Sequence, residues 1–409
     1  MRRLLRLLPL VMCISCDDKV IEGLERGACG QRTQGITEVA RPTTDLLDSF
    51  GVQVHFAFAE YADINKVVAD LASLGMRHTR DDAGEISPMS TKAVGIKEAA
   101  RRGIRTQLLL DRDDSVEELS LALGSALEAV EVPWPREAPG DFMTSEVFAK
   151  TKALRATIDG FPASRRLQLI GPLLGNQKGV DDIPRLDSFL DAGATWYPRP
   201  ATAQSIAEQT ARASKWAPGL PLVNVFGQHY PIKPGGSERD VTPAQQARYV
   251  LRFYLAQFRA GIVRAYYSQL YDAGDPFSYA LATEQGVPKP SFFALQSLAA
   301  ILFDAGPEPP SSPVAFTLQD TAPSSSELRH LILRRSDGTF VLIVWLDIAS
   351  TPEETTRPVV VRFGGEVANV VLDSLHGLNV PKQTLKAAPT IELVVSDHPS
   401  ALTFNVVCP

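Results

Sequence analysis

The sequence is poor in cysteine, histidine and clustered basic residues, and each shortage excludes a class of protein. The 409 residues include four cysteines and six histidines, whose scattered positions argue against a Cys/His metal site. Lysine and arginine form no block and the net charge is −6, which excludes a nucleic-acid partner because phosphate binding needs a basic face. No metal and no cofactor are expected. With 44% apolar residues, the chain can bury the cores of two globular units.

The N-terminus has the pattern of an export signal. Arg2, Arg3 and Arg6 precede the short apolar run 7–12, and a small residue then stands just before Cys16. This resembles a bacterial lipoprotein signal, with Cys16 as the acylated first residue of the mature chain, so a lipid anchor in the cell envelope is expected. Ordinary signal cleavage is one alternative. A retained membrane anchor is another, although the run is shorter than the ~20 residues of a membrane span.

Export changes the interpretation of the remaining cysteines. If lipid takes Cys16 and the signal is removed, Cys29 and Cys408 are left, one near each end of the mature chain. Because disulfides persist in exported proteins, a bridge between them is the natural hypothesis, with two unpaired thiols as the alternative. The bridge would fasten the N-terminal arm to the last strand and add about 2–5 kcal/mol of stability.

From residue 51 to about residue 305, β-branched segments alternate with segments whose apolar residues recur three or four apart. Eight such pairs in roughly 250 residues predict a (β/α)8 TIM barrel. A doubly wound open sheet would also alternate, but no glycine-rich phosphate turn follows the first strand. The expected strand and helix pairs are 51–56 with 61–74, 77–80 with 93–102, 105–110 with 116–127, 129–132 with 145–158, 167–171 with 183–190, 194–197 with 203–216, 220–225 with 243–260, and 262–269 with 292–303.

Beyond the barrel the pattern changes to short strands. Prolines crowd residues 306–313, which predicts a break in regular structure. Asp337-Gly338 then indicates a hairpin turn, since these residues tolerate the positive φ of a tight turn. The segments 329–334, 339–345, 358–363, 367–372, 391–395 and 402–407 predict a small antiparallel β-sandwich. The expected organisation is a signal peptide at 1–15, an N-terminal arm at 16–50, the barrel at 51–305, a Pro/Ser-rich linker at 306–327 and the β-sandwich at 328–409.

Several segments together resemble the (β/α)8 glycoside hydrolases related to xylosidases and cellulases. Residues 51–55 are similar to their first strand and residues 74–82 to their second. Residues 245–267 resemble their final barrel unit, and residues 288–295 resemble the Lys-Pro opening of their last helix. The resemblance covers nearly all of 51–407. It implies a retaining mechanism, with an acid/base and a nucleophile whose carboxyls lie about 5–5.5 Å apart.

At both positions where that family places a catalytic carboxyl, this sequence has another residue. Glu131 aligns with the start of the Glu-x-x-Asn-Glu-Pro motif, but Pro135 occupies the place of the acid/base. Val225 occupies the place of the nucleophile at the end of the seventh strand. Catalytic degeneracy is therefore expected, and Glu137 is the weak candidate for a displaced acid. Arg136 beside it would keep that carboxylate ionised, which is the wrong state for an acid.

Side chains suited to holding a sugar follow the predicted strands, at the end of the barrel where function is normally located. Aromatic rings stack on the apolar face of a pyranose, while amides and charged groups bind its hydroxyls. Alternatively, the rings pack under loops and the polar groups pair with one another, as Arg80 with Asp81 or Asp111. The candidates are His55, Arg80, Glu131, Trp134, Trp196, Tyr197, Asn224, His229 and Gln269.

Three functions follow from these observations. The first is an exported, lipid-anchored barrel that binds a carbohydrate without cleaving it. The second is a working glycoside hydrolase whose carboxylates come from positions that do not align, such as Glu137. The third is a scaffold or interaction protein of the cell envelope that has no sugar ligand.

Overall fold

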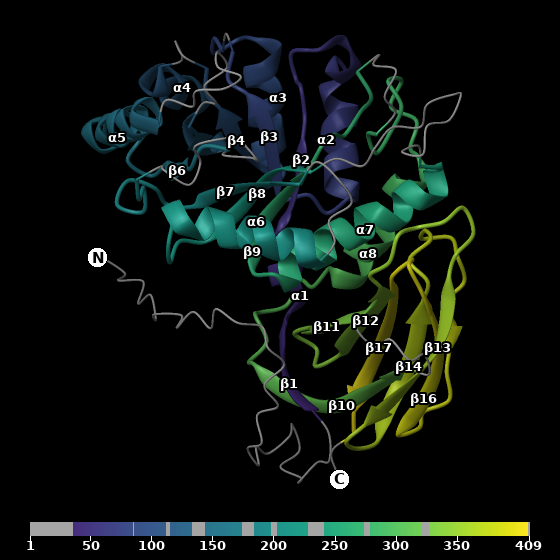
Figure 1. Ribbon diagram of the computed structural model, residues 1–409. Helices are drawn as coiled ribbons and strands as arrows, with labels where there is room; N and C mark the ends of the chain where they lie inside the picture. The colour runs from purple at the N-terminus through teal and green to yellow at the C-terminus, as the bar shows by residue number, and fades with distance from the viewer. Residues whose placement is uncertain are drawn as a thin grey trace.

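The computed structural model describes residues 36–84, 86–111, 115–132, 144–173, 184–197, 203–227, 241–273, 279–320 and 327–407. It consists of a barrel of strands surrounded by helices and, below it in Figure 1, a second unit built from β-strands. This confirms the predicted fold class, a TIM barrel followed by a β-sandwich.

Eight parallel strands form the barrel, in the order β6-β5-β4-β3-β2-β9-β8-β7. A β-bridge between Ile170 and Ala192 joins the two end strands and closes the sheet. The strands are β2 (Phe50–Gln53), β3 (His78–Asp82), β4 (Arg105–Leu109), β5 (Leu127–Glu131), β6 (Gln168–Ile170), β7 (Gly193–Tyr197), β8 (Leu222–Gly227) and β9 (Ile262–Tyr267).

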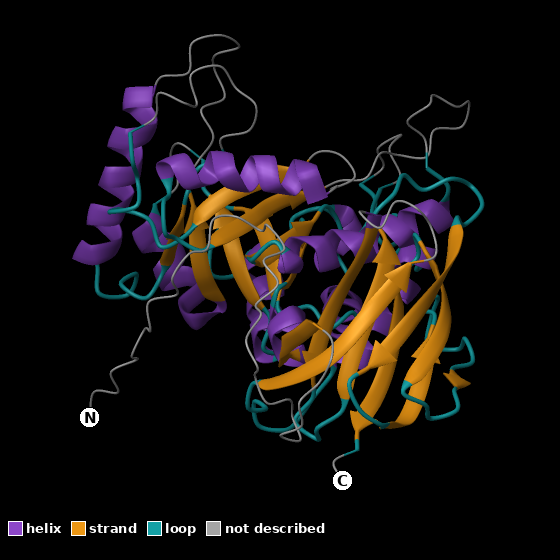
Figure 2. Ribbon diagram, turned by 60° about the horizontal axis from the view of Figure 1, so that its bottom comes forward, coloured by secondary structure: helices purple, strands orange, loops and turns teal. Residues whose placement is uncertain are grey.

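Helices cover the outside of the barrel (Figure 2), and several begin where a side chain caps the first turn. Asp63, Ser90 and Ser115 each accept a hydrogen bond from a backbone N–H of the helix that follows, and Thr242 forms a capping box with Gln245. These caps satisfy N–H groups that helix geometry leaves free. No helix in the described part of the chain is long and apolar enough to cross a membrane. The helices are α1 (Thr43–Asp48), α2 (Ile64–Ser73), α3 (Thr91–Arg101), α4 (Val116–Leu123), α5 (Thr144–Gly160), α6 (Ala203–Trp216), α7 (Pro243–Arg259) and α8 (Pro290–Leu302).

The helix expected at 183–190 is wrong for the residues described there. None of residues 184–190 is helical: residues 187–189 form a turn, and the N–H of Leu190 donates to the carbonyl of Leu186. A segment this short gains few internal hydrogen bonds for the cost of starting a helix. Leu186 and Leu190 have helical spacing because both are buried in the barrel core.

A separate apolar cluster, which we call the lumen cluster, occupies the inside of the barrel. On β8, Val223 and Val225 belong to it, whereas Leu222 belongs to the larger core that includes the helices. Tyr266 of β9 extends its ring over Gly51, where an added Cβ would lie 2.6 Å from the ring, so only glycine fits there. The cluster consists of Ala129, Ile170, Ala192, Ala194, Val223, Val225 and Tyr266.

Charged side chains gather around Glu128 at the end of the barrel where the strands begin. Its two carboxylate oxygens pair with His78 Nδ1 at 2.9 Å and with Arg264 Nη2 at 3.0 Å, and Arg105 Nη1 lies 3.2 Å away. These residues come from β3, β4, β5 and β9, so Glu128 ties separate strands together. Burial alone would raise the pKa of Glu128, but the hydrogen bond with His78 and the charge of Arg264 outweigh it and lower the pKa to about 2.

Replacing Glu128 with glutamine should weaken the protein in a pH-dependent way. A carboxyl whose pKa is lowered on folding stabilises the folded state above its unfolded pKa, near 4.5, and loses that contribution as the pH falls toward 2. The pH-dependent part is on the order of 3 kcal/mol. Urea unfolding at pH 7, 5 and 3 should show a gap between wild type and Glu128→Gln that narrows with acidity. The exposed Glu118→Gln is the control, and a gap that stays constant with pH would contradict the role assigned to Glu128.

The second unit has two sheets that share strand β1. One sheet has the order β1-β10-β13-β16 and the other β1-β11-β12-β17-β14-β15, and side chains of both form one core. The predicted turn is confirmed, since Gly338 has φ +88° and Asp337 accepts the N–H of Thr339. The strands are β1 (Ile36–Pro42), β10 (Ser312–Asp320), β11 (Leu328–Arg334), β12 (Phe340–Leu346), β13 (Thr356–Phe363), β14 (Val367–Asp373), β15 (Gln383–Thr384), β16 (Thr390–Ser396) and β17 (Ser400–Val406).

Two of these strands lie where the sequence predicts only an arm and a linker. β1 falls within the arm 16–50, and β10 falls within the linker 306–327. Pro313 lies opposite Val39 of β1 as the second residue of β10, and a proline is tolerated at the start of a strand. The predicted linker 306–327 therefore contains a strand, since β10 occupies Ser312–Asp320.

The barrel and the sandwich share a buried junction. Ile343, Trp345 and Leu375 of the sandwich belong to the same apolar core as the barrel helices. Arg248 of α7 pairs with Asp397 of the sandwich at 3.0 Å, and both side chains are 1% exposed. Nη2 of Arg248 also donates to the carbonyls of Thr351 and Pro352 at 2.8 and 3.1 Å, and the two units therefore pack as one body.

Candidate functional site

The C-terminal ends of the strands meet at one end of the barrel, which we call the mouth, and the structure describes part of it. His55 follows β2, Arg80 lies near the end of β3, Glu131 ends β5 and Gln269 follows β9. The candidates Trp134, His229 and Glu137, together with Pro135, Cys16, Cys29 and Cys408, lie outside the described residues.

Arg80 and Glu131 form an ion pair inside the barrel. Arg80 Nε and Nη2 donate to the two carboxylate oxygens at 2.8 and 3.2 Å, and Gln107 Nε2 donates to the same carboxylate at 3.1 Å. Ala129 lies on the same face of β5 as Glu131 and belongs to the lumen cluster, so this group is inside the barrel. Arg80 therefore pairs with Glu131, and not with Asp81 or Asp111 as the sequence left open.

Val225 is completely buried in the lumen cluster. An apolar side chain thus faces the inside of the barrel where the resemblance places a nucleophile. Its neighbour Asn224 lies on the other face of the strand and is also fully buried. The Oδ1 of Asn224 accepts the N–H of Phe226 at 3.0 Å, and its Nδ2 has no partner among the described residues. The structure therefore does not bring Asn224 to the Arg80–Glu131 pair.

Two adjacent carboxyls at the end of β3 have opposite electrostatic states. Asp81 is completely buried, accepts the N–H of Phe56 at 3.1 Å, and has a pKa raised well above its usual value by burial and by the hydrogen bond with Asp82. At Asp82 burial would also raise the pKa, but hydrogen bonds from Asp81 and Lys92 outweigh it and lower the pKa. Asp81 has no exposed surface, so it holds the loop after β2 in place and does not reach a ligand.

The same group illustrates why three nearby ligand atoms need not form a metal site. His55, Asp81 and Asp82 lie close enough together to hold an ion. However, Lys92 Nζ is 2.9 Å from Asp82 Oδ1 and 3.9 Å from Asp81 Oδ1. The lysine thus already supplies the positive charge that a cation would bring.

His55 lies beside Gln269 at the mouth and remains partly exposed. Its ring stacks on Phe58 with centroids 4.9 Å apart, and its Nε2 lies 3.3 Å from Gln53 Nε2. Burial lowers the pKa of His55, against the opposing effects of Asp82 and of a hydrogen bond with Gln269, so the ring is neutral at neutral pH. A neutral imidazole beside two amides can both donate and accept hydrogen bonds, as sugar hydroxyls require.

The aromatic candidate Trp196 of β7 lies apart from this group. Trp196 is half-buried, and it lines a small pocket together with Arg212 and Trp216 of α6. Ala194 belongs to the lumen cluster, and regular alternation would place Trp196 on the same face of β7. The strand register shifts between Thr195 and Trp196, which interrupts this alternation. Tyr197 ends β7, and its side chain lies outside the described part of the chain.

Sequence reasoning missed two mouth residues, Gln53 and Gln107. The Oε1 atoms of both are buried and have no partner among the described residues. Because buried polar atoms are nearly always hydrogen-bonded to protein, water or ligand, the acceptor of the partly exposed Gln53 favours a polar ligand or ordered water at the mouth. The acceptor of Gln107, which is completely buried, favours ordered water inside the barrel. Both glutamines lie within predicted strands, where alternate side chains face the core. A polar residue at such a position is the signal that could have identified them.

Three described carboxyls at the mouth are engaged by cationic partners. Glu131 is bound by Arg80 and Asp82 by Lys92, as described above, and Asp272 pairs with Lys289 at 2.6 Å. A retaining mechanism needs one carboxyl free to attack and another free to donate a proton. The described part of the mouth provides hydrogen-bonding groups for a polar ligand, but Glu131, Asp82 and Asp272 are each held by a cation and do not form such a pair.

Solved structures with a similar fold are glycoside hydrolases. A family 39 glycoside hydrolase from the gut symbiont Bacteroides cellulosilyticus WH2 matches with a TM-score of 0.59 and 16% identity, over 90% of this chain and 81% of that one. A family 44 xyloglucanase from Paenibacillus polymyxa gives a TM-score of 0.53 at 9% identity, over 91% and 98%. The catalytic domain of the GH30 xylanase C from Talaromyces cellulolyticus gives 0.52 at 11%, over 92% and 99%.

The sequence has no significant match to a protein-family model or to a curated protein. At the identities of the structural matches, the similarity establishes the fold alone. That fold is a TIM barrel with a β-sandwich. The matches to the family 44 xyloglucanase and to the GH30 xylanase each cover more than nine-tenths of this chain.

Proposed function

We propose that this protein, which has the fold of barrel glycoside hydrolases, binds a carbohydrate at the mouth of the barrel without hydrolysing it. We also propose that it is exported and anchored to the cell envelope by lipid on Cys16. The observation that carries the first proposal is Val225, a fully buried valine in the lumen cluster at the nucleophile position. A valine can neither attack a sugar nor hold a proton.

The polar groups near His55 support binding. The unpartnered Oε1 atom of Gln53, whose amide lies beside His55, and the neutral ring of His55 present hydrogen-bonding groups at the mouth. Such groups fix the orientation of a ligand in a pocket. A sugar hydroxyl can donate to an amide oxygen and accept from an N–H, so a saccharide matches their chemistry.

Binding and turnover should be measured together on the purified protein. We expect no release of aryl leaving groups from a panel of aryl glycosides, and binding to at least one class on a glycan array. For the glycan found, His55→Phe keeps the ring stacked on Phe58 but removes its hydrogen bonds, and Gln53→Met removes the amide. Each should weaken binding by about tenfold, which corresponds to about 1.4 kcal/mol.

The matched control is Gln257→Met. Gln257 is a buried glutamine of α7 whose amide atoms also have no partner among the described residues, but it lies on an outer helix away from the mouth. It should leave binding unchanged. Equal losses in Gln257→Met and Gln53→Met would show that the effect comes from general destabilisation and not from the mouth.

Two other outcomes would favour the alternative functions. Turnover of an aryl glycoside that disappears in Glu137→Gln would show an active hydrolase with a displaced acid and would overturn the proposal. Absence of any glycan binding, combined with retention by a protein of the envelope, would favour a scaffold. Labelling with a radioactive fatty acid that is lost in Cys16→Ser would test the anchor separately.

A further inference from the structure

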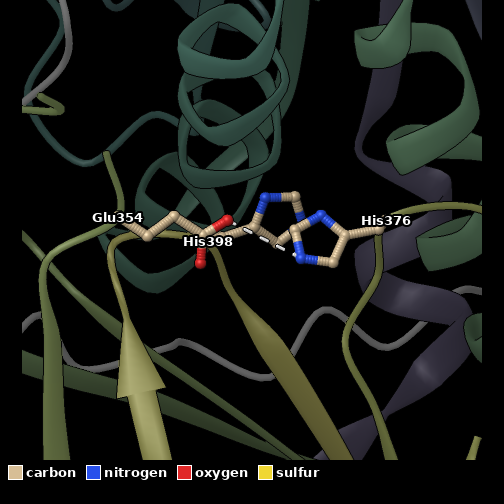
Figure 3. A group of neighbouring side chains, drawn as sticks. All are labelled: Glu354, His376 and His398. Carbon is tan, nitrogen blue, oxygen red and sulfur yellow. Dashed lines mark ion pairs between the residues drawn. The ribbon is translucent and has the colours of Figure 1, made fainter. Parts of the chain in front are cut away.

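Three side chains with metal-binding atoms meet at one end of the β-sandwich, close to its junction with the barrel. Glu354 lies just before β13, His376 follows β14, and His398 lies in the bend between β16 and β17. Figure 3 shows the carboxylate of Glu354 directed toward the ring of His376, with the ring of His398 beside it. Three separate connections of the sandwich therefore converge on one point.

The distances within this group suit a single ion. Glu354 Oε1 lies 3.7 Å from His376 Nε2, and the two imidazole rings have centroids 3.9 Å apart. One ligand atom from each residue lies within 4.8 Å of the others. A tetrahedral ion with bonds of about 2.0–2.1 Å holds its ligand atoms roughly 3.3–3.5 Å apart. Glu354 and His376 have exposed side chains, 36% and 44%, so they can make the small adjustment that remains.

His398 is the member of the group that ordinary packing explains least. It is 3% exposed, and its Nε2 has no hydrogen-bond partner among the described residues. A buried nitrogen of this kind normally has a partner, and a metal ion would supply one.

Neighbouring contacts hold this group in place. The backbone N–H of His398 donates to Ser396 Oγ at 3.0 Å, and the Ser396 hydroxyl donates to Glu354 Oε2 at 3.1 Å. That leaves Oε1 of Glu354, the atom nearer His376, for a ligand. Asp397 is fixed by its pair with Arg248 of the barrel. Supporting hydrogen bonds of this kind orient the ligands in known metal sites.

We propose that Glu354, His376 and His398 bind one divalent transition-metal ion of the zinc class, with solvent completing its coordination. Two imidazoles and one carboxylate favour zinc over calcium or magnesium, which prefer oxygen ligands. The ion fastens three connections of the sandwich beside the barrel junction. Its role is therefore structural, and it is independent of any ligand at the mouth of the barrel.

The test uses the purified full chain without a histidine tag, stripped of metal by a chelator. We expect isothermal titration with zinc chloride to give one ion per chain, and zinc to raise the melting temperature. Cobalt(II) in place of zinc should show the visible absorption of a tetrahedral site. His376→Ala and Glu354→Gln should each lower zinc affinity by at least about tenfold, because the loss of a residue that only hydrogen-bonds to a metal ligand already lowers affinity by that factor. Each should also remove the zinc-dependent rise in melting temperature.

The control variant is His330→Ala. His330 pairs with Glu38 at 2.7 Å in the same domain, but this pair is not among the described groups of three potential ligands. It should bind zinc as wild type does. Failure of the wild type to bind zinc at micromolar concentrations, or unchanged binding in Glu354→Gln, would overturn the proposal. Glu354→Gln preserves side-chain size at an exposed position, so it decides the question even if His376→Ala fails to fold.

Discussion

Arg248→Met is expected to destabilise the protein by about 3–5 kcal/mol, because it removes the cation that neutralises Asp397 in a buried junction and leaves the carboxylate with the hydroxyl of Ser350 as a donor. The pair is 1% exposed on both sides, so water cannot replace the lost partner. The carbonyls of Thr351 and Pro352 also lose their donor. Urea unfolding followed by tryptophan fluorescence would measure the loss, and Trp345 in the shared core reports directly on the junction.

The same substitution on the same helix provides the control. Arg259 ends α7 and is exposed, so Arg259→Met should change stability by no more than about 0.5 kcal/mol. We also expect Arg248→Met to unfold in two steps, since the sandwich would separate from the barrel before the barrel itself unfolds. A single transition with a loss below 1 kcal/mol would mean that Asp397 finds another partner and that the junction does not depend on this pair.

Arg80→Met should cause a comparable loss inside the barrel, again about 3–5 kcal/mol. Glu131 would keep the donor Gln107 at 3.1 Å, but it would lose both hydrogen bonds from the guanidinium and the neutralising charge. Because the pair joins β3 to β5 across β4, its loss affects three adjacent strands. Differential scanning calorimetry and urea unfolding at neutral pH would measure the effect.

A double substitution separates the charge effect from the loss of packing. Arg80→Met combined with Glu131→Met removes both charges and should recover part of the stability lost in Arg80→Met, since no uncompensated carboxylate remains. Arg77→Met, at a partly exposed arginine just before β3, is the control for the substitution itself. A double variant less stable than Arg80→Met would show that the two side chains matter through their shape rather than their charge.

The spacing of apolar residues in the sequence was sufficient to predict most helices and strands of the barrel, because each helix must present one apolar face to the strands. The helix α6 begins and ends where the apolar spacing of 203–216 predicts. The failures have physical causes: Leu186 and Leu190 have helical spacing without enough length for a helix, and the prolines before Phe316 conceal the strand β10. Strand β1 was hidden because its partners β10 and β11 lie more than 250 residues away.

The candidate site was less accessible from the sequence. Local patterns identified Arg80 and Glu131 separately, but the two residues are 51 positions apart in the sequence, and they pair because β3 and β5 flank β4 in the sheet. Asn224 lies within β8 and Trp196 within β7, and strand alternation and a register shift direct their side chains away from the lumen. The group of Glu354, His376 and His398 gave no signal at all, since its members belong to three connections that only the folded sandwich brings together.

The position of β1 determines how this chain can be divided and in what order it can fold. β1 precedes the barrel in sequence, yet in space it lies between β10 and β11, so the barrel is an insertion within the sandwich. During synthesis, β1 cannot pair with β10 and β11 until the whole barrel has been translated, because both neighbours follow the barrel in the sequence. A fragment cut at the start of the barrel would lack this strand, and the bare edges of β10 and β11 would be open to pairing with other molecules.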